Sequence, residues 1–348
     1  MAFRVLVAGG AGLVGSAVAR QLLSEGAEVV VVDRMGDDGD GRAVKERRAS
    51  ALRAFPKATF VAADLALPGA AGDLFRDLAP AAVVNAALFA PGGGGVEAML
   101  AAAARHGKPF LVHLSDGALY GPPASPGQPA LEEEPVDPGP DPLLLQRLDE
   151  ESRLRGSEVP HVILRLFGLL APGAPVTRFP QDALEALLDG EEVVLPSDAP
   201  RDLLHVRDAV HGILAALALR PSGRTLNIGS GRSAAPSRVV RLLAERAFRQ
   251  ARIRVALSPA RTPRIASPDR AVETLRFRPR TSLETALDEI VAARLGAPER
   301  TTSRPGAAPA GPLRPGTPRA PEPGGPKEVS RRELFGFFRR PFDDGRPR

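Results

Sequence analysis

Short apolar runs alternate with longer amphipathic segments over the first half of the chain. The runs predict β-strands at 3–8, 28–33, 58–62, 82–86, 109–114 and 161–166. The segments between them predict helices at 13–25, 43–54, 70–78, 95–106 and 143–155. Regular alternation of strand and helix is typical of α/β proteins in which helices cover both faces of a parallel sheet. We therefore expect a doubly wound parallel sheet.

The pattern changes after residue 173, where the segments become shorter and more mixed. It predicts helices at 178–189, 207–219, 236–249 and 282–294, with strands at 193–195, 225–228 and 252–257. We interpret residues 1–173 as one domain, to which later parts of the chain return. Residues 174–296 then form a smaller α/β region that holds the substrate.

The last part of the chain has no apolar periodicity. Residues 297–329 are rich in Pro, Gly, Ala and Arg, and such a segment buries too little apolar surface to offset its ordering entropy. We expect a disordered linker there, followed by a Phe/Arg-rich motif at 330–348. The segment SRRELFGFFRRPFDD (330–344) holds four phenylalanines and four arginines.

Composition and charge exclude several kinds of function. The chain of 348 residues has no cysteine, which excludes disulfides and thiolate metal sites. The formal net charge of +5 lies within residues 297–348, so the remaining chain is neutral and gives no case for nucleic-acid binding. No cluster has metal-ligand spacing, and no apolar run is long enough to span a bilayer. Without a signal-peptide pattern, we expect a cytoplasmic protein.

The run RVLVAGGAGLVGSAVARQLLSEGAEVVVVD (4–33) carries the clearest functional signal. A strand leads into a glycine-rich turn and a helix, and a second strand ends at an acidic residue. This arrangement fits a dinucleotide, with the pyrophosphate at the helix start and the ribose at the acid. The residues concerned are Gly9, Gly10, Gly12, Leu13, Val14, Gly15 and Asp33.

The acidic residue also bears on which dinucleotide binds. The carboxylate of Asp33 accepts ribose hydroxyls but repels a 2′-phosphate, so NAD is favoured and NADP is less favoured. Arg34 follows directly, and its positive charge weakens this preference for NAD.

In these and further motifs the chain resembles the extended short-chain dehydrogenases/reductases, in the NAD-dependent epimerase/dehydratase family that includes UDP-galactose 4-epimerase. The resemblance runs from about residue 3 to 295 and implies that Asp64, Leu65 and Ala86 also contact the cofactor. It rests on these motifs, in order: GGAGLVG (9–15), Asp33, Asp64-Leu65, VVNAA (83–87), FLVHLSDGALYG (110–121), LRLFGLLAPG (164–173), RDLLHVRDAV (201–210), NIGSG (227–231) and DRAVETLRFRPRTSLETAL (269–287).

The resemblance also shows what this chain lacks. The family's chemistry uses a tyrosine as acid/base, four residues before a lysine that lowers its pKa and holds the nicotinamide ribose. Here Leu143 stands at the tyrosine position and Arg147 at the lysine position, where it keeps the ability to hold a ribose. The sole tyrosine, Tyr120, matches a structural turn position instead. The family's hydroxyl-orienting residue corresponds to Asp116 or to Ser115.

The resemblance also bears on the residues that would contact a substrate. The segment LFAPGGGG (88–95) is shorter than the family's usual substrate-covering loop. The resemblance places Arg201 at a position that contacts a nucleotide-sugar diphosphate, with Arg261 and Arg264 near a second such position. His113 is interpreted as a packed core residue and His205 as a structural one.

Two hypotheses follow for function. In the first, the protein binds NAD(H), has lost the Tyr/Lys chemistry and acts as a ligand-responsive binding or scaffold protein. In the second, it is an atypical epimerase, dehydratase or reductase of nucleotide sugars that uses Asp116 or Ser115. We expect a nucleotide sugar or another phosphorylated small molecule as its ligand.

Protein partners are expected at the C-terminal motif. Residues 330–344 could dock on a partner's groove, contact an anionic membrane or fold back on the chain. SRRELF also resembles the twin-arginine export signature, but its place at the far end argues against export. Members of the family often form homodimers through a four-helix interface. The helix beginning near residue 95 is altered in this chain, so the sequence does not decide whether the protein dimerises.

Overall fold

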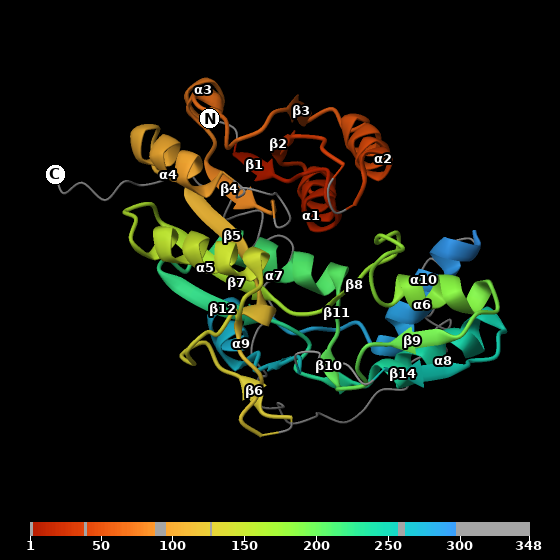
Figure 1. Cartoon of the computed structure of the whole chain (residues 1–348). Coiled ribbons are helices and arrows are strands. Elements are labelled where there is room, and N and C mark those ends of the chain that lie inside the picture. Colours follow the sequence, from red (N-terminus) through yellow and green to blue (C-terminus); the bar gives the residue numbers. More distant parts are fainter. Residues whose placement is uncertain (1–2, 38–39, 88–94, 126, 257–261, 297–348) are drawn as a thin grey trace, which may run out of the picture.

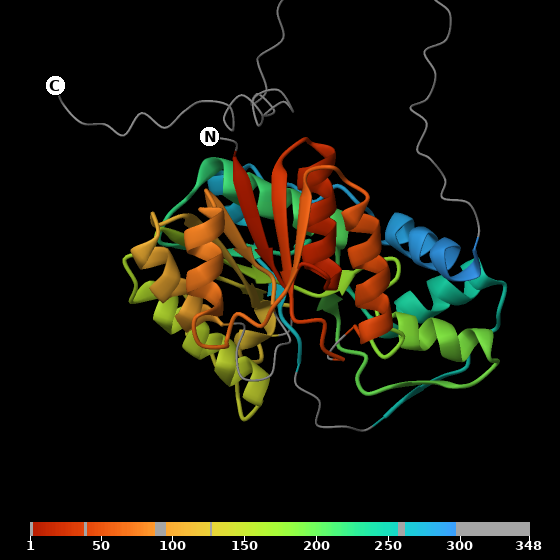
Figure 2. The ribbon, with the colours of Figure 1, turned by 90° about the horizontal axis from the view of Figure 1, so that it is seen from above.

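A computed structural model of the chain describes residues 3–37, 40–87, 95–125, 127–256 and 262–296. The predictions for 297–348, and for Arg261, lie outside these described residues. Within them, a seven-stranded sheet forms the centre of the molecule, and helices cover both of its faces (Figure 1, Figure 2).

The sheet is parallel throughout, with strand order β12-β7-β5-β4-β1-β2-β3. This confirms the expected Rossmann-type, doubly wound α/β fold. Its strands have these bounds: β1 Arg4–Ala8, β2 Glu28–Asp33, β3 Ala58–Ala62, β4 Ala82–Asn85, β5 Phe110–Asp116, β7 His161–Leu166 and β12 Arg224–Ile228.

Alternate side chains of each central strand enter two separate hydrophobic clusters. In β1, Val5 and Val7 pack on one face, while Leu6 and Ala8 pack on the other. Both faces are therefore buried, which is why these strands are continuous apolar runs in the sequence. The first face is covered by α1 Leu13–Ser24, α7 Val206–Leu219 and α9 Asp269–Leu275, together with α2 Arg42–Arg53. The second is covered by α3 Ala70–Leu78, α4 Val96–Arg105 and α5 Pro142–Arg155.

A smaller cluster of elements lies beside the sheet, to the right in Figure 1. Its core is formed by α6, β9, α8 and α10, and β14 pairs with β9 in parallel. The bounds are α6 Gln181–Leu188, β9 Val193–Leu195, α8 Pro236–Ala247, β14 Ile253–Val255 and α10 Leu283–Leu295.

Parts of the chain after residue 173 return to the main sheet. β12 pairs with β7 and forms the sheet's edge, α7 packs against α1, and α9 packs against β12. The later half of the chain therefore contributes both to the main sheet and to the smaller cluster.

Two helix boundaries differ from the sequence prediction by more than one residue. The helix expected from residue 178 begins at Gln181, because Pro180 disfavours helical backbone at the preceding Phe179. The helix expected to reach residue 249 ends at Ala247, because Phe248 has a left-handed conformation, with φ +54°.

The sequence pattern did not indicate several very short elements, including α9. Three two-residue strand pairs connect loops: β6 Pro129–Ala130 with β15 Ile265–Ala266, β8 Leu169–Leu170 with β11 Leu204–His205, and β10 Arg201–Asp202 with β13 Ser233–Ala234. The buried carboxylate of Asp202 ties β10 to β15 and to the loop before β13, because it accepts hydrogen bonds from the backbone N–H groups of Ser230, Gly231 and Ala266. A 3₁₀ turn, η1 Gly117–Leu119, follows β5.

Candidate functional site

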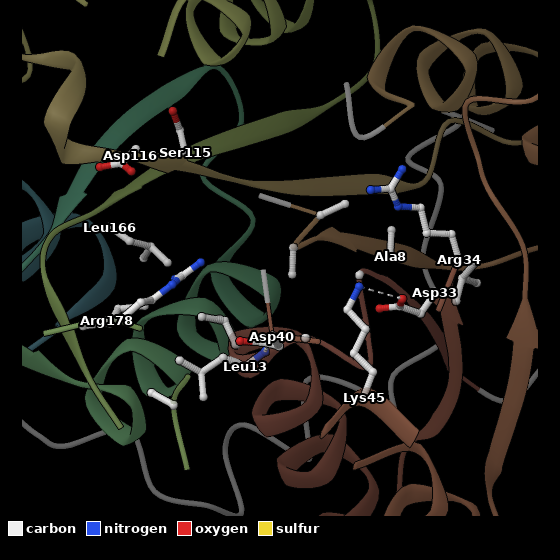
Figure 3. Close-up of a pocket in the computed structure, with 18 of the residues that line it drawn as sticks. Ala8, Leu13, Asp33, Arg34, Asp40, Lys45, Ser115, Asp116, Leu166 and Arg178 are labelled. Atoms are coloured by element: carbon white, nitrogen blue, oxygen red, sulfur yellow. Dashed lines mark hydrogen bonds and ion pairs between the residues drawn. The ribbon is translucent and has the colours of Figure 1, made fainter. Parts of the chain in front are cut away.

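A cavity of about 300 Å³ lies at the carboxyl ends of the main sheet's strands (Figure 3). The chain moves outward from β1 to β2 and β3, and then crosses to β4 on the other side of β1. Ligands of open α/β sheets bind at such a reversal of strand order. The turns after β1, β2, β3, β4, β5 and β7 all line the cavity, and the segment 174–181 closes it on one side.

The turn after β1 requires glycine for two different reasons. Gly9 has a φ of +68°, and a Cβ there would lie 2.7 Å from the backbone nitrogen of Ala87. A Cβ on Gly15 would lie 2.2 Å from the carbonyl oxygen of Gly9. The turn therefore packs directly against the start of α1. Gly12, Leu13 and Val14 at that helix start line the cavity, as a pyrophosphate site requires.

Asp33 lies at the end of β2 and is almost fully buried. Its carboxylate accepts hydrogen bonds from the backbone N–H groups of Ala11 (3.0 Å) and Met35 (2.9 Å). Lys45 of α2 places its ammonium 3.7 Å from the same carboxylate. These contacts fix the Asp33 side chain at the cavity wall, where it can accept a ligand hydroxyl.

A second carboxylate lies at the start of α1. Asp40 lines the cavity, and its Oδ2 accepts a hydrogen bond from the backbone N–H of Leu13 at 2.8 Å. Arg48 of α2 forms an ion pair with the same oxygen at 2.6 Å. The N-terminus of a helix favours negative charge. Asp40 therefore occupies a position that is also suited to a pyrophosphate.

The structure brings most of the predicted cofactor residues together around this cavity. Gly9, Gly12, Leu13, Val14, Asp33, Arg34, Asp64, Leu65 and Ala86 all line it. Gly10 and Gly15 shape the turn behind the wall, since a Cβ on Gly10 would lie 2.6 Å from Val31 Cγ1. Arg147 lies behind the wall too, with Nη2 3.4 Å from the carbonyl oxygen of Ala87.

Ser115 and Asp116 line the cavity at the end of β5. The hydroxyl of Ser115 donates a hydrogen bond to Glu151 Oε1 at 2.6 Å, and Arg165 donates two hydrogen bonds to the same carboxylate. Burial raises the pKa of Glu151, but the hydrogen bonds and charge of Arg165, with the Ser115 hydroxyl, lower that pKa overall. Ser115 is thus part of a buried ionic network that joins β5, α5 and β7.

Asp116 is half-buried and accepts a hydrogen bond from the backbone N–H of Ala118 at 2.8 Å. Burial raises the pKa of its carboxyl group, while the Ala118 N–H and the positive charge of Arg147 act in the opposite direction. Because Asp116 lies in the cavity wall, a bound ligand could contact this carboxyl group, whose pKa is raised above its ordinary value.

The positions that correspond to the family's tyrosine and lysine lie on α5. Leu143 is 42% exposed and lies outside the cavity wall. Arg147 is buried and forms an ion pair with Glu150. Glu150 also lies 3.7 Å from Nε2 of His113, which is fully buried and whose pKa burial lowers to about 4. His113 is therefore neutral at pH 7, and its Nδ1 pairs with the Asn85 amide at 3.1 Å.

Tyr120 is buried away from the cavity. Its hydroxyl donates a hydrogen bond to Asn227 Oδ1 at 2.9 Å, and its ring faces the guanidinium of Arg165 at 4.7 Å and stacks near Phe167. Burial raises the pKa of the phenol. These contacts give Tyr120 a packing role.

The predicted substrate arginines lie in different surroundings. The guanidinium of Arg201 faces the ring of Phe179, a cavity residue, at 5.4 Å, and burial lowers its pKa. Arg264 is buried and donates two hydrogen bonds to the Glu134 carboxylate, so it connects two loops. His205 caps α7, where its Nδ1 accepts a hydrogen bond from the Arg207 backbone at 3.2 Å.

Sequence reasoning missed three charged residues of the wall: Asp40, Lys45 and Arg178. Lys45 is one of only four lysines in an arginine-rich chain, which could have marked it. Asp40 and Arg178 lie in loops, and no sequence pattern around them indicates that these loops line the cavity. In Figure 3, Arg178 points into the cavity from the side opposite Asp33.

The described residues contain neither a metal-binding cluster nor a membrane-spanning helix. No group of three or more His, Cys, Asp or Glu side chains there could hold a metal ion. None of the helices in this part of the chain combines the length and hydrophobicity that a membrane crossing requires.

The sequence is similar to known proteins of one family. The sequence model of the NAD dependent epimerase/dehydratase family matches residues 5–229, so the chain belongs to that family. A dTDP-glucose 4,6-dehydratase from Streptomyces griseus is 29% identical in an alignment that covers 71% of this chain and 79% of the relative. A UDP-glucose 4-epimerase from Azospirillum brasilense is 29% identical in an alignment that covers 86% of this chain and 97% of the relative.

A solved structure shares the fold. The dTDP-glucose 4,6-dehydratase of Bacillus anthracis in complex with NAD superposes with a TM-score of 0.77 at 19% identity. The match covers 85% of this chain and 97% of the dehydratase chain. The extended short-chain dehydrogenase/reductase fold expected from the motifs is thereby confirmed.

Proposed function

We propose that this protein binds NAD(H) in the cavity but has lost the Tyr/Lys chemistry of its family, and that it acts as a ligand-responsive binding or scaffold protein. The proposal is supported above all by the side chains that α5 presents at the positions of the family's tyrosine and lysine. Leu143 cannot transfer a proton, and the guanidinium of Arg147 is paired with Glu150, so it does not take the part of the family's lysine. The sole tyrosine is hydrogen-bonded to Asn227 outside the cavity wall.

The residues of the wall fit a dinucleotide. Asp33 would accept ribose hydroxyls, and the N–H groups at the start of α1 would hold the phosphates once Asp40 moves aside. Asp64 and Leu65 would border the adenine. The nicotinamide, when bound, supplies a hydride acceptor or donor.

A nucleotide sugar is the second ligand of the proposal. The two curated relatives are named for dTDP-glucose and UDP-glucose. In this chain Arg178 lines the cavity on the side opposite Asp33, and Arg201 faces the ring of Phe179 beside it. A guanidinium fork matches phosphate oxygens in geometry and charge. These two arginines are the residues proposed to hold the diphosphate.

The alternative is an active, atypical epimerase, dehydratase or reductase. Asp116 favours it, because this carboxyl lines the cavity and burial raises its pKa toward the range useful for proton transfer. In that case Asp116 would exchange a proton with a substrate hydroxyl. Ser115, already a donor to Glu151, would be limited to accepting a hydrogen bond from that hydroxyl.

The two functions are separated by binding and turnover measurements on the purified full chain. NAD and NADH are titrated by calorimetry, and UDP-glucose and dTDP-glucose are then supplied, with chromatography of the sugars as the readout. We expect dinucleotide binding without sugar conversion. Conversion that Asp116→Asn abolishes would establish the alternative. Asp137→Asn is the matched control, because Asp137 makes the same turn contact, to the Gly139 N–H at 3.0 Å, outside the cavity.

We also propose that residues 330–344 bind a protein partner. The clustering of phenylalanine and arginine in this segment supports it. Its test compares the full chain with a chain that ends at residue 296. An unchanged set of copurifying proteins and an unchanged location in the cell would remove the partner from the proposal.

A further inference from the structure

A smaller cavity, of about 230 Å³, is lined by α1, α2, the start of α7 and the loop after β8. α1 packs against both of the other helices (Figure 1). We call this cavity the α1–α2 pocket. Leu13 separates it from the main cavity, because this side chain lines both. The wall has mostly apolar side chains, among them Ala17, Leu52 and Val206, and three polar ones, Ser16, Arg20 and Arg48.

The two arginines give the α1–α2 pocket a positive charge. Arg20 follows Ser16 by one turn of α1, so both side chains lie on the same face of the helix. Arg20 is exposed, and its guanidinium pairs with no carboxylate in the described part of the chain. Arg48 pairs with Asp40 at 2.6 Å. None of the residues described in the pocket wall is acidic, so the two arginines and Asp40 together leave a formal charge of +1.

We propose that the α1–α2 pocket binds a small organic phosphate, with the phosphate group between Arg20 and Arg48. Guanidinium groups match phosphate oxygens in geometry and charge. The apolar part of the ligand would pack on Leu13 and Val206, which are half-buried and line the same pocket. A wall that is mostly apolar, with a few convergent polar groups, favours an organic phosphate over inorganic phosphate.

Asp40 couples this pocket to the main cavity. Its carboxylate lines the main cavity and holds the Arg48 guanidinium. A dinucleotide that displaces Asp40 leaves the charge of Arg48 to the organic phosphate, and a phosphate on Arg48 in turn weakens the hold of Arg48 on Asp40. Each ligand therefore strengthens binding of the other by the same factor. This coupling rests on the proposed function, whereas binding of the organic phosphate alone does not.

The test is calorimetric titration of the full chain with phenyl phosphate. Inorganic phosphate and benzyl alcohol represent its charged and its apolar half, and we expect phenyl phosphate to bind more tightly than either. Arg20→Gln should weaken phenyl phosphate binding by about tenfold, the usual effect of losing one hydrogen bond to a charged group. Because Arg20 is exposed and has no carboxylate partner among the described residues, this variant breaks no ion pair there.

Arg47→Gln is the matched control for Arg20→Gln. Arg47 is an exposed arginine of α2 that does not line the α1–α2 pocket, so loss of its charge should leave the affinity for phenyl phosphate unchanged. Absence of phenyl phosphate binding, or an affinity that Arg20→Gln does not lower relative to Arg47→Gln, overturns the inference.

The same titration with saturating NAD tests where phenyl phosphate binds. We expect its affinity to rise by about fivefold, a usual size for coupling between two sites. A phosphate bound in the main cavity would instead be displaced, so lower affinity in the presence of NAD overturns the inference, and equal affinity overturns the coupling. If the chain does not bind NAD, the proposed function fails, while the comparison of Arg20→Gln with Arg47→Gln still decides whether the pocket binds the phosphate.

Discussion

Asp40 is the residue whose position bears most directly on affinity for the cofactor. Its carboxylate accepts the Leu13 N–H at the start of α1, so a pyrophosphate must displace it. We expect Asp40→Asn to tighten binding of NAD and NADP alike by about 3- to 10-fold, since a competing charge at a helix N-terminus is worth about 1 kcal/mol. Calorimetric titration measures this change.

Asp37→Asn is the control for that variant. Asp37 lies in the same loop and accepts the backbone N–H of Arg42 at 3.0 Å, at the start of α2 and outside the cavity wall. Its substitution should leave dinucleotide affinity unchanged. Weaker binding by Asp40→Asn would mean that Asp40 organises the phosphate site instead of competing for it.

His113 should make stability depend on pH. Burial lowers its pKa from 6.5 to about 4 in the folded chain, with Glu150 opposing the shift and Arg147 adding to it. Below pH 6.5 His113 becomes protonated in the unfolded chain, whereas in the folded chain it stays neutral down to about pH 4. The unfolded chain therefore binds more protons between these pH values, and the free energy of unfolding falls as the pH is lowered. The loss should be on the order of 3 kcal/mol.

Urea denaturation at a series of pH values checks this expectation. His113→Asn keeps an acceptor for the Asn85 amide and removes the titrating ring. The variant should lose less stability than the unmodified chain between pH 6.5 and about pH 4. Equal pH dependence in both proteins would show that other groups are responsible.

At the residue scale, the sequence predicted positions that a local motif specifies. Gly9 and Asp33 could be predicted because the strand, turn and helix that hold them are contiguous in the chain. Arg178 could not, because its place in the wall depends on how the segment before α6 packs against the sheet. No short-range pattern encodes that packing.

At the scale of elements, Glu151 joins three of them. It lies on α5, accepts two hydrogen bonds from Arg165 of β7, and accepts a third from Ser115 of β5. Glu151→Gln leaves the buried Arg165 without a full counter-charge, so we expect the free energy of unfolding to fall by about 3–5 kcal/mol. Chemical denaturation provides the measurement.

Glu158→Gln is the matched control for Glu151→Gln. Glu158 is exposed and pairs with Lys108 at 2.8 Å on the surface, where solvent screens the interaction. Its substitution should change stability only slightly. If both variants lost the same small amount, the buried network would not hold β5, α5 and β7 together.

The sequence predicted long elements much better than short ones. The strands of the main sheet are runs of apolar residues long enough to be identified on their own, as in Glu28–Asp33. The pair β6 and β15 has two residues in each strand, from segments far apart in the chain. Such pairs form only because the tertiary fold brings the segments together, so local periodicity does not indicate them.

At the scale of the whole molecule, the cavity is shared between the main sheet and the segment that leads into the smaller cluster. Asp33 and Ser115 belong to the sheet, while Arg178 and Gln181 belong to that segment and to the start of α6. A ligand that touches both sides stabilises the folded chain by mass action. Its binding free energy is therefore distributed over both parts of the molecule.

The contacts of Arg48 extend this sharing beyond the cavity. Its guanidinium bonds to Asp40 at 2.6 Å, and also to the carbonyl oxygen of Gly173 at 3.0 Å, in the loop between β8 and α6. A dinucleotide that displaces Asp40 frees Arg48 from one partner, and the change is transmitted to that loop. Deuterium uptake by the backbone amides at 174–182 should therefore change when a dinucleotide binds. In the Arg48→Gln variant this change should be smaller, because the part of it that is transmitted through the Arg48 side chain is lost.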